Sequence, residues 1–125
     1  MDFSEYNALG EILHTSWGKS SSKTGLFSVK GRFVGENQVK LIYTTIINLV
    51  SDRELDLMKR KYSEESDDII KQAVTNIKKE YKEKTGKSLK MKEKDSQVTL
   101  EIINSNIYNR KRTAYLRRFV TLEVG

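Results

Sequence analysis

The sequence predicts an α+β fold with the element order α-β-β-α-β-β. In this fold, two hairpins form a four-stranded antiparallel or mixed sheet, which packs on one long central helix. Two patterns carry the prediction. Apolar residues between 51 and 86 recur at spacings of three and four, the period of an amphipathic helix. The segments on either side alternate apolar and polar residues, the period of a strand.

The predicted central helix covers residues 51–86. Residues 51–54 read Ser-Asp-Arg-Glu, the form of a capping box, and Gly86 can take the left-handed conformation that ends helices. Between these ends runs an apolar stripe: Leu55, Met58, Tyr62, Ile69, Ile70, Ala73, Val74, Ile77 and Tyr81. Six polar residues, 63–68, interrupt the stripe, and Ser66 followed by two Asp could cap a new helix. The sequence leaves open whether the helix is continuous there.

The first fifty residues predict a helix, a tether and a hairpin. Residues 18–23 are Ser-rich and predict a flexible tether, which leaves 24–125 as a single α+β domain. Alternation over 27–33 and 39–49 predicts a hairpin, and the second strand is also apolar on its other face, as a strand central in its sheet or covered on both sides would be. An amphipathic helix over 1–17 presents one apolar stripe: Phe3, Tyr6, Leu9, Ile12 and Leu13.

That N-terminal stripe has two interpretations. If the helix folds back on the domain, its apolar residues are core. If the Ser-rich tether projects the helix, the same residues form a docking helix that lies in the groove of a neighbouring subunit. We name the five residues as candidates for docking on the second interpretation.

The chain after the central helix predicts the second hairpin. Residues 87–95 form a lysine-rich connector in which Leu89 and Met91 alternate as in a short edge strand. A third strand is expected over 98–103, then a nine-residue loop, and a fourth strand over 114–124.

Composition limits the chemistry. The absence of Cys excludes disulfides and thiolate metal sites. The formal net charge is +6, of which residues 87–125 carry +5, with nine basic and four acidic side chains. No signal peptide is apparent, and the most apolar run, 41–50, is too short to span a bilayer. We expect a protein without cofactor, metal or membrane contact, either soluble and intracellular or incorporated in a virion-like particle.

The clearest constellation is the basic hairpin 104–118 and the strand that continues it, where residues 108–119 hold five cations and three aromatic side chains. Such a segment can bind phosphates or protein carboxylates. Arg117 and Arg118 point to opposite faces of a strand, so at most one joins the loop cations. The other should pair with a carboxylate such as Glu101 or Glu123, or with a partner subunit. The candidate residues for binding a partner or nucleic acid are Tyr108, Arg110, Lys111, Arg112, Tyr115, Arg117 and Arg118.

Other motifs do not support catalysis. Gly-Lys-Ser at 18–20 and 86–88 lacks the earlier Gly that a phosphate-binding loop needs. His14 is the one His of the chain, and the acidic residues of 64–68 are typical of a solvated helix face. The sequence therefore predicts no catalytic residue.

We expect a non-enzymatic structural subunit of a larger protein assembly, for example a virion or tail component of a phage-like particle. Its contacts with neighbouring subunits, in a homo- or hetero-oligomer, would come from the N-terminal helix and the basic hairpin. The alternative is a small RNA- or DNA-binding α+β module that uses hairpin 104–118.

Overall fold

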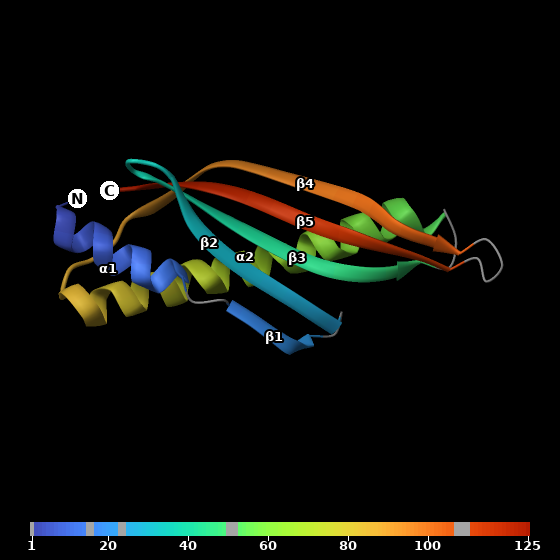
Figure 1. Ribbon diagram of the computed structural model, residues 1–125, viewed down its shortest axis with the longest axis horizontal. Coiled ribbons are helices and arrows are strands. Elements are labelled where there is room, and N and C mark those ends of the chain that lie inside the picture. The colour runs from blue at the N-terminus through green and yellow to red at the C-terminus, as the bar shows by residue number, and fades with distance from the viewer. Residues whose placement is uncertain (1, 15–16, 23–24, 50–52, 107–110) are drawn as a thin grey trace.

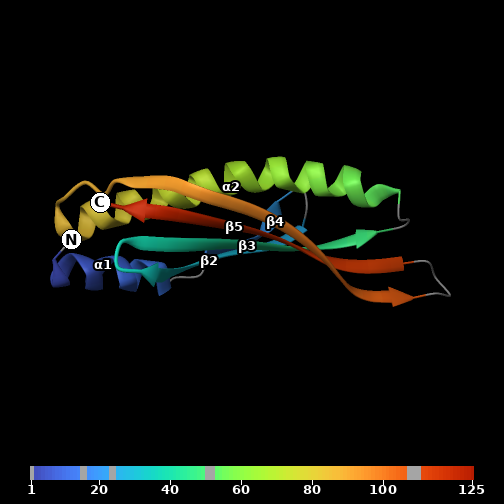
Figure 2. The same ribbon diagram turned by 90° about the horizontal axis from the view of Figure 1, so that it is seen from above.

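The computed structural model describes residues 2–14, 17–22, 25–49, 53–106 and 111–125 (Figure 1). It confirms the α+β fold: two helices pack on an antiparallel sheet, and the long helix runs along it (Figure 2). The elements in chain order are α1 (Phe3–His14), β1 (Trp17–Ser22), β2 (Gly25–Gly35), β3 (Gln38–Leu49), α2 (Glu54–Thr85), β4 (Met91–Asn106) and β5 (Lys111–Val124).

The sheet has five strands in the order β1-β2-β3-β5-β4, and every neighbouring pair is antiparallel. The two predicted hairpins are β2-β3 and β4-β5. They join through β3 and β5, which pair in an unbroken register from Gln38↔Glu123 to Leu49↔Arg112. β3 therefore lies at the centre of the sheet, as its two apolar faces predicted.

The fifth strand corrects the expected tether. β1 takes the place of most of residues 18–23 and pairs with β2, with Trp17 opposite Val29 and Lys19 opposite Phe27. The pattern of small polar residues gives no alternation from which a strand could be predicted. The backbone pairs nevertheless, because the edge of β2 offers unpaired N–H and C=O groups. Lys23, the last residue of the expected tether, lies outside the described part of the chain.

The central helix is continuous through its polar stretch. α2 runs from Glu54 to Thr85 without a break, and Gly86 ends it at φ 74°, with its N–H donating to the Lys82 carbonyl at 2.8 Å. The other end differs from the prediction, because Arg53 stands at the N-cap and makes no side-chain cap hydrogen bond. Ser51 of the predicted capping box lies outside the described residues.

The second hairpin is longer than predicted. β4 is one strand of 16 residues where a connector, a short edge strand and a third strand were expected. The expected loop 104–112 is also shorter, since Asn104 pairs with Thr113 and Asn106 with Lys111. Register shifts at 93–95 and 102–104 explain both errors. Each shift inserts a residue and moves the alternation to the other face, so one long strand looks like several segments.

The core lies between the helices and one face of the sheet, which we call the covered face. Because side chains alternate along a strand, the residues between the buried ones lie on the opposite face, which we call the open face. Both helices pack on the covered face, with α1 beside the C-terminal end of α2 (Figures 1 and 2). The buried sheet residues of the cluster are Val29, Val39, Leu41, Tyr43, Ile47, Ala114, Leu116, Val120, Leu122 and Val124.

The N-terminal helix folds back and belongs to this core. Leu9, Ile12 and Leu13 are buried, which corrects the expectation that they form a docking surface. Gly31 of β2 permits the close approach, because a Cβ there would lie 2.8 Å from Leu13 Cδ2. Of the five candidates, Phe3 and Tyr6 remain exposed, Phe3 at 80%.

Truncating α1 residues distinguishes core from docking arm. We expect Leu9→Ala to lower the free energy of unfolding by about 2–5 kcal/mol, because it removes a fully buried side chain. Phe3→Ala, on the same helix, should change it by less than about 0.5 kcal/mol. Urea unfolding of both variants measures this. Equal, small effects would mean that α1 does not pack on the domain.

Candidate interaction site

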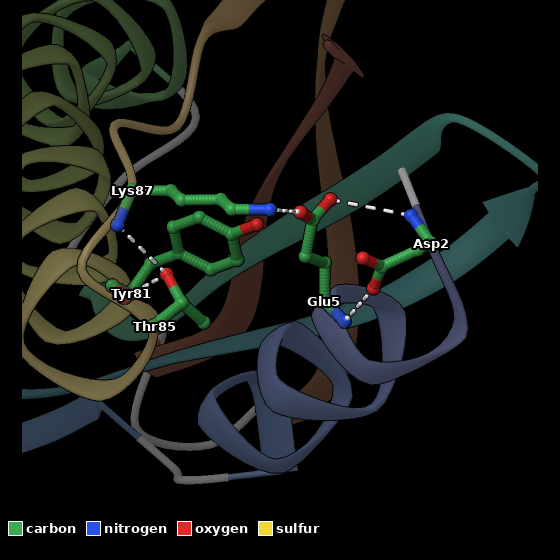
Figure 3. A network of polar contacts seen from close by, with 5 residues as sticks. All are labelled: Asp2, Glu5, Tyr81, Thr85 and Lys87. Atoms are coloured by element: carbon green, nitrogen blue, oxygen red, sulfur yellow. Dashed lines mark hydrogen bonds and ion pairs between the residues drawn. The ribbon is translucent and has the colours of Figure 1, made fainter.

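A polar network ties the N-terminal end of α1 to the C-terminal end of α2 (Figure 3). Asp2 and Glu5 form a reciprocal capping box: the Glu5 N–H donates to Asp2 Oδ1 at 2.8 Å, and the Asp2 N–H donates to Glu5 Oε2 at 3.2 Å. The Lys87 ammonium donates to the Glu5 carboxylate. Nearly two turns further along α1, Lys84 of α2 donates to Glu11.

These contacts shift the pKa values of the groups involved. The hydrogen bond from Lys87 lowers the pKa of Glu5 below its ordinary value of 4.5, and the backbone N–H of the capping box lowers it further. The same contact raises the pKa of Lys87 above 10.5. The hydrogen bond from Lys84 lowers the pKa of Glu11. All three shifts favour the charged forms that hold α1 against α2.

The fixed helix presents Phe3 at its tip. Tyr6 stacks on Phe33 of β2, with ring centroids 4.2 Å apart and an interplanar angle of 19°. A hollow lies between these α1 residues and the β2–β3 turn, lined by Asp2, Phe3, Tyr6, Gly35, Glu36 and Asn37. The N-terminal candidate surface is therefore smaller than predicted and consists of Phe3, Tyr6 and this hollow.

Arg118 does not belong to an interaction surface, which corrects its prediction as a partner-binding residue. It lies on the covered face, with its side chain 14% exposed, under the polar stretch of α2. Its guanidinium donates to the Ser63 carbonyl at 3.2 Å and to Ser66 Oγ at 3.4 Å, and it pairs with Asp67 at 2.5 Å. The Ser66 hydroxyl is itself buried and donates to the Ser63 carbonyl at 2.7 Å. The polar stretch of the continuous helix therefore faces a largely buried cation.

Arg117 points the opposite way, as the alternation of a strand predicts. Its guanidinium lies 5.1 Å from the centre of the Tyr115 ring and 3.4 Å from the Glu101 carboxylate on β4. The expected pairing with Glu101 is therefore present, on the open face. Arg117 and Tyr115 are the two hairpin candidates that the structure places together on a surface.

The open face carries a second cation–aromatic pair that the sequence did not single out. Lys40 Nζ of β3 lies 4.9 Å from the centre of the Phe119 ring of β5. Ile42 stands directly opposite Phe119, and Ile46 opposite Tyr115. The signal for these residues was the apolar second face of β3, which indicated a central strand but not which face the helices would leave uncovered.

The tip of the basic hairpin is only partly placed. The backbones of Lys111 and Arg112 begin β5 and pair with Asn106 and Ser105. Tyr108 and Arg110 lie outside the described residues. The described part of the hairpin ends near the start of α2 (Figure 2), and its role in binding stays a prediction.

Comparisons with known proteins give no family: no protein-family model, no curated protein and no solved structure matches the chain. Among the described residues, no group of three or more His, Asp or Glu side chains is placed to hold a metal ion. No helix of the described part is long and apolar enough to cross a membrane.

The two neighbouring arginines allow a matched test. We expect Arg118→Ala to lower the free energy of unfolding by about 2–4 kcal/mol, because it removes charge-assisted hydrogen bonds from a largely buried site. Arg117→Ala removes an exposed pair and should cost less than about 1 kcal/mol. Urea unfolding compares the two. Losses of equal size would contradict the internal role of Arg118.

The polar network at α1 predicts an acid-sensitive contact. Carboxylates with lowered pKa values stabilise the fold fully above 4.5, and this contribution is lost as the pH falls through the lowered values. We expect wild type to be more stable than Glu5→Gln/Glu11→Gln at pH 7, with the difference disappearing in acid. Urea unfolding across a pH series measures it, with exposed Glu83→Gln as control. A difference independent of pH would contradict the ionic contact.

Proposed function

We propose that the chain is a non-enzymatic structural subunit of a larger protein assembly and that the open face is its main contact surface. The observation that carries this proposal is the composition of that face. Antiparallel sheets with one solvated face usually carry polar residues on it. Here the two central strands carry Ile42, Ile46, Tyr115 and Phe119 on the uncovered side, and Ile46 is 44% exposed.

The apolar residues form two cross-strand pairs, Ile42 with Phe119 and Ile46 with Tyr115, on either side of the row of Thr44 and Arg117. Apolar residues grouped on one face of a small protein usually mark a contact site. The rings of Tyr115 and Phe119 are each accompanied by a cation. A rigid surface of this kind, with aromatic centre and charged surroundings, has the composition of a protein–protein interface.

Two smaller features support contacts with further neighbours. Phe3 projects at one end of the molecule beside the hollow at the β2–β3 turn. The basic hairpin lies at the opposite end (Figure 1). A subunit with contact surfaces on one face and at both ends can connect several neighbours. A virion or tail of a phage-like particle is one assembly of this kind, and it stays a prediction.

Binding of RNA or DNA is the second candidate, and the cation–aromatic pairs favour it. Cations beside aromatic rings on a sheet can hold a single strand through phosphate contacts and base stacking. Two observations favour a protein partner instead. Glu101 already neutralises Arg117, and Asp95 and Glu123 stand on or beside the same face. A face that carries both signs of charge suits a protein partner better than a polyanion.

Light scattering of the full chain tests the proposal. At both low and high salt, we expect self-association or higher multimers that do not respond to a short mixed nucleic acid. The opposing result is a monomer at high concentration that shifts only with nucleic acid and only at low salt, since phosphate binding weakens steeply with salt. The matched variant Arg110→Gln/Lys111→Gln/Arg112→Gln would abolish that shift if the hairpin binds nucleic acid.

A further inference from the structure

We propose that the partner on the open face is a second copy of this chain, packed sheet against sheet about a two-fold axis that runs parallel to the strands between β3 and β5. This inference rests on the proposed function, since it names the neighbour that the assembly surface binds. It is drawn from how charge is distributed across the face.

One side of the open face is basic. β2 and β3 contain no acidic residue, and they carry three cations, Lys30, Arg32 and Lys40. By alternation with buried Val29 and Val39, all three stand on the open face. Arg32 and Lys40 are direct cross-strand neighbours, which is unfavourable for like charges unless an anion approaches.

The opposite side of the face carries both charges, and along β4 its carboxylates come after its lysines. β4 places Asp95 opposite Thr121 and Glu101 opposite Tyr115, both on the open face. The lysines of this edge lie toward the start of β4, where Lys94 pairs with Glu123 at 3.5 Å. Within the described residues, neither Arg32 nor Asp95 makes an ion pair of its own.

The strand register places Arg32 and Asp95, which carry opposite charges, at the same position along the strand direction. In the backbone register, Arg32 stands opposite Lys40, Lys40 opposite Thr121, and Thr121 opposite Asp95. Arg32 and Asp95 therefore lie at the two ends of one row of residues that crosses four strands. A two-fold axis between β3 and β5 puts β2 of one copy over β4 of the other without shifting the level. Arg32 then lies opposite Asp95 of the second copy, and the symmetry repeats this pair.

The same operation brings the apolar residues together at the centre. β3 lies over β5 of the second copy, so Ile42 is at the level of the second Phe119 and Ile46 at the level of the second Tyr115. Aligned packing of two twisted sheets, at about 30° to one another and about 10 Å apart, is the ordinary geometry of a β-sandwich.

The size of the face fits such a dimer. Ten residues of β3 at about 3.3 Å each, across four strands about 4.8 Å apart, outline on the order of 600 Å² per copy. Side chains that stand up from the sheet add to this outline. A standard stable interface buries about 800 Å² per partner.

Charge reversal tests the pairing directly. Arg32→Asp and Asp95→Arg should each make the full chain monomeric, raising the dimer dissociation constant at least about tenfold, because each places like charges at both symmetric contacts. An equimolar mixture of the two variants should form a 1:1 heterodimer, since both contacts are then complementary again. Size-exclusion chromatography with light scattering measures the masses, and circular dichroism confirms that each variant is folded.

Lys79→Asp is the control, because it makes the same change of charge on the exposed side of α2 and should leave the wild-type dimer intact. Self-association that both open-face variants leave unchanged would overturn this inference while leaving the assembly function in place. Variants that stay monomeric when mixed would also overturn it. A wild-type monomer that binds only nucleic acid, at low salt, would overturn both.

Discussion

The arrangement of the molecule depends on one buried contact between sheet and helix, that of Arg118 with α2. A cation on the covered face of β5 must have polar partners, because an unpaired buried charge is strongly destabilising. α2 supplies them at Ser63, Ser66 and Asp67. A helix shifted along the sheet by one turn would place Tyr62 or Ile70 where Ser66 now meets the guanidinium. The contact therefore favours one position of α2 along the sheet.

Once α2 is placed, the rest of the core follows. Its apolar residues after the polar stretch, Ile70, Ala73, Ile77 and Tyr81, face the sheet toward the end where α1 packs. Gly31 lets α1 approach β2, and the ion pairs of Glu5 and Glu11 hold it against the last turns of α2. Both helices therefore pack on the covered face of the sheet. The sheet is left with a face that no described element covers.

Local patterns predicted what depends on local sequence. The alternation of β2 and β3 and the terminating Gly86 were enough for the first hairpin and the end of α2. The failures depended on partners distant in sequence. The tether proved to be β1 because it pairs with an available edge, and Arg118 proved internal because α2 offers it polar atoms. The apolar residues of α1 that were predicted to dock on a neighbour lie mostly in the core, because Gly31 leaves room for Leu13. The cation–aromatic pairs of the open face need a cross-strand register that no single segment contains.

The adjacent residues Arg117 and Arg118 show how one strand connects stability to recognition. Arg118 ties β5 to α2 on the covered face, while Arg117 stands with Tyr115 and Glu101 on the open face. Because consecutive side chains point to opposite faces, the internal contact holds the backbone that presents the external one. The partner proposed for the open face would therefore meet a backbone that is already held in place, which lowers the conformational entropy lost on binding.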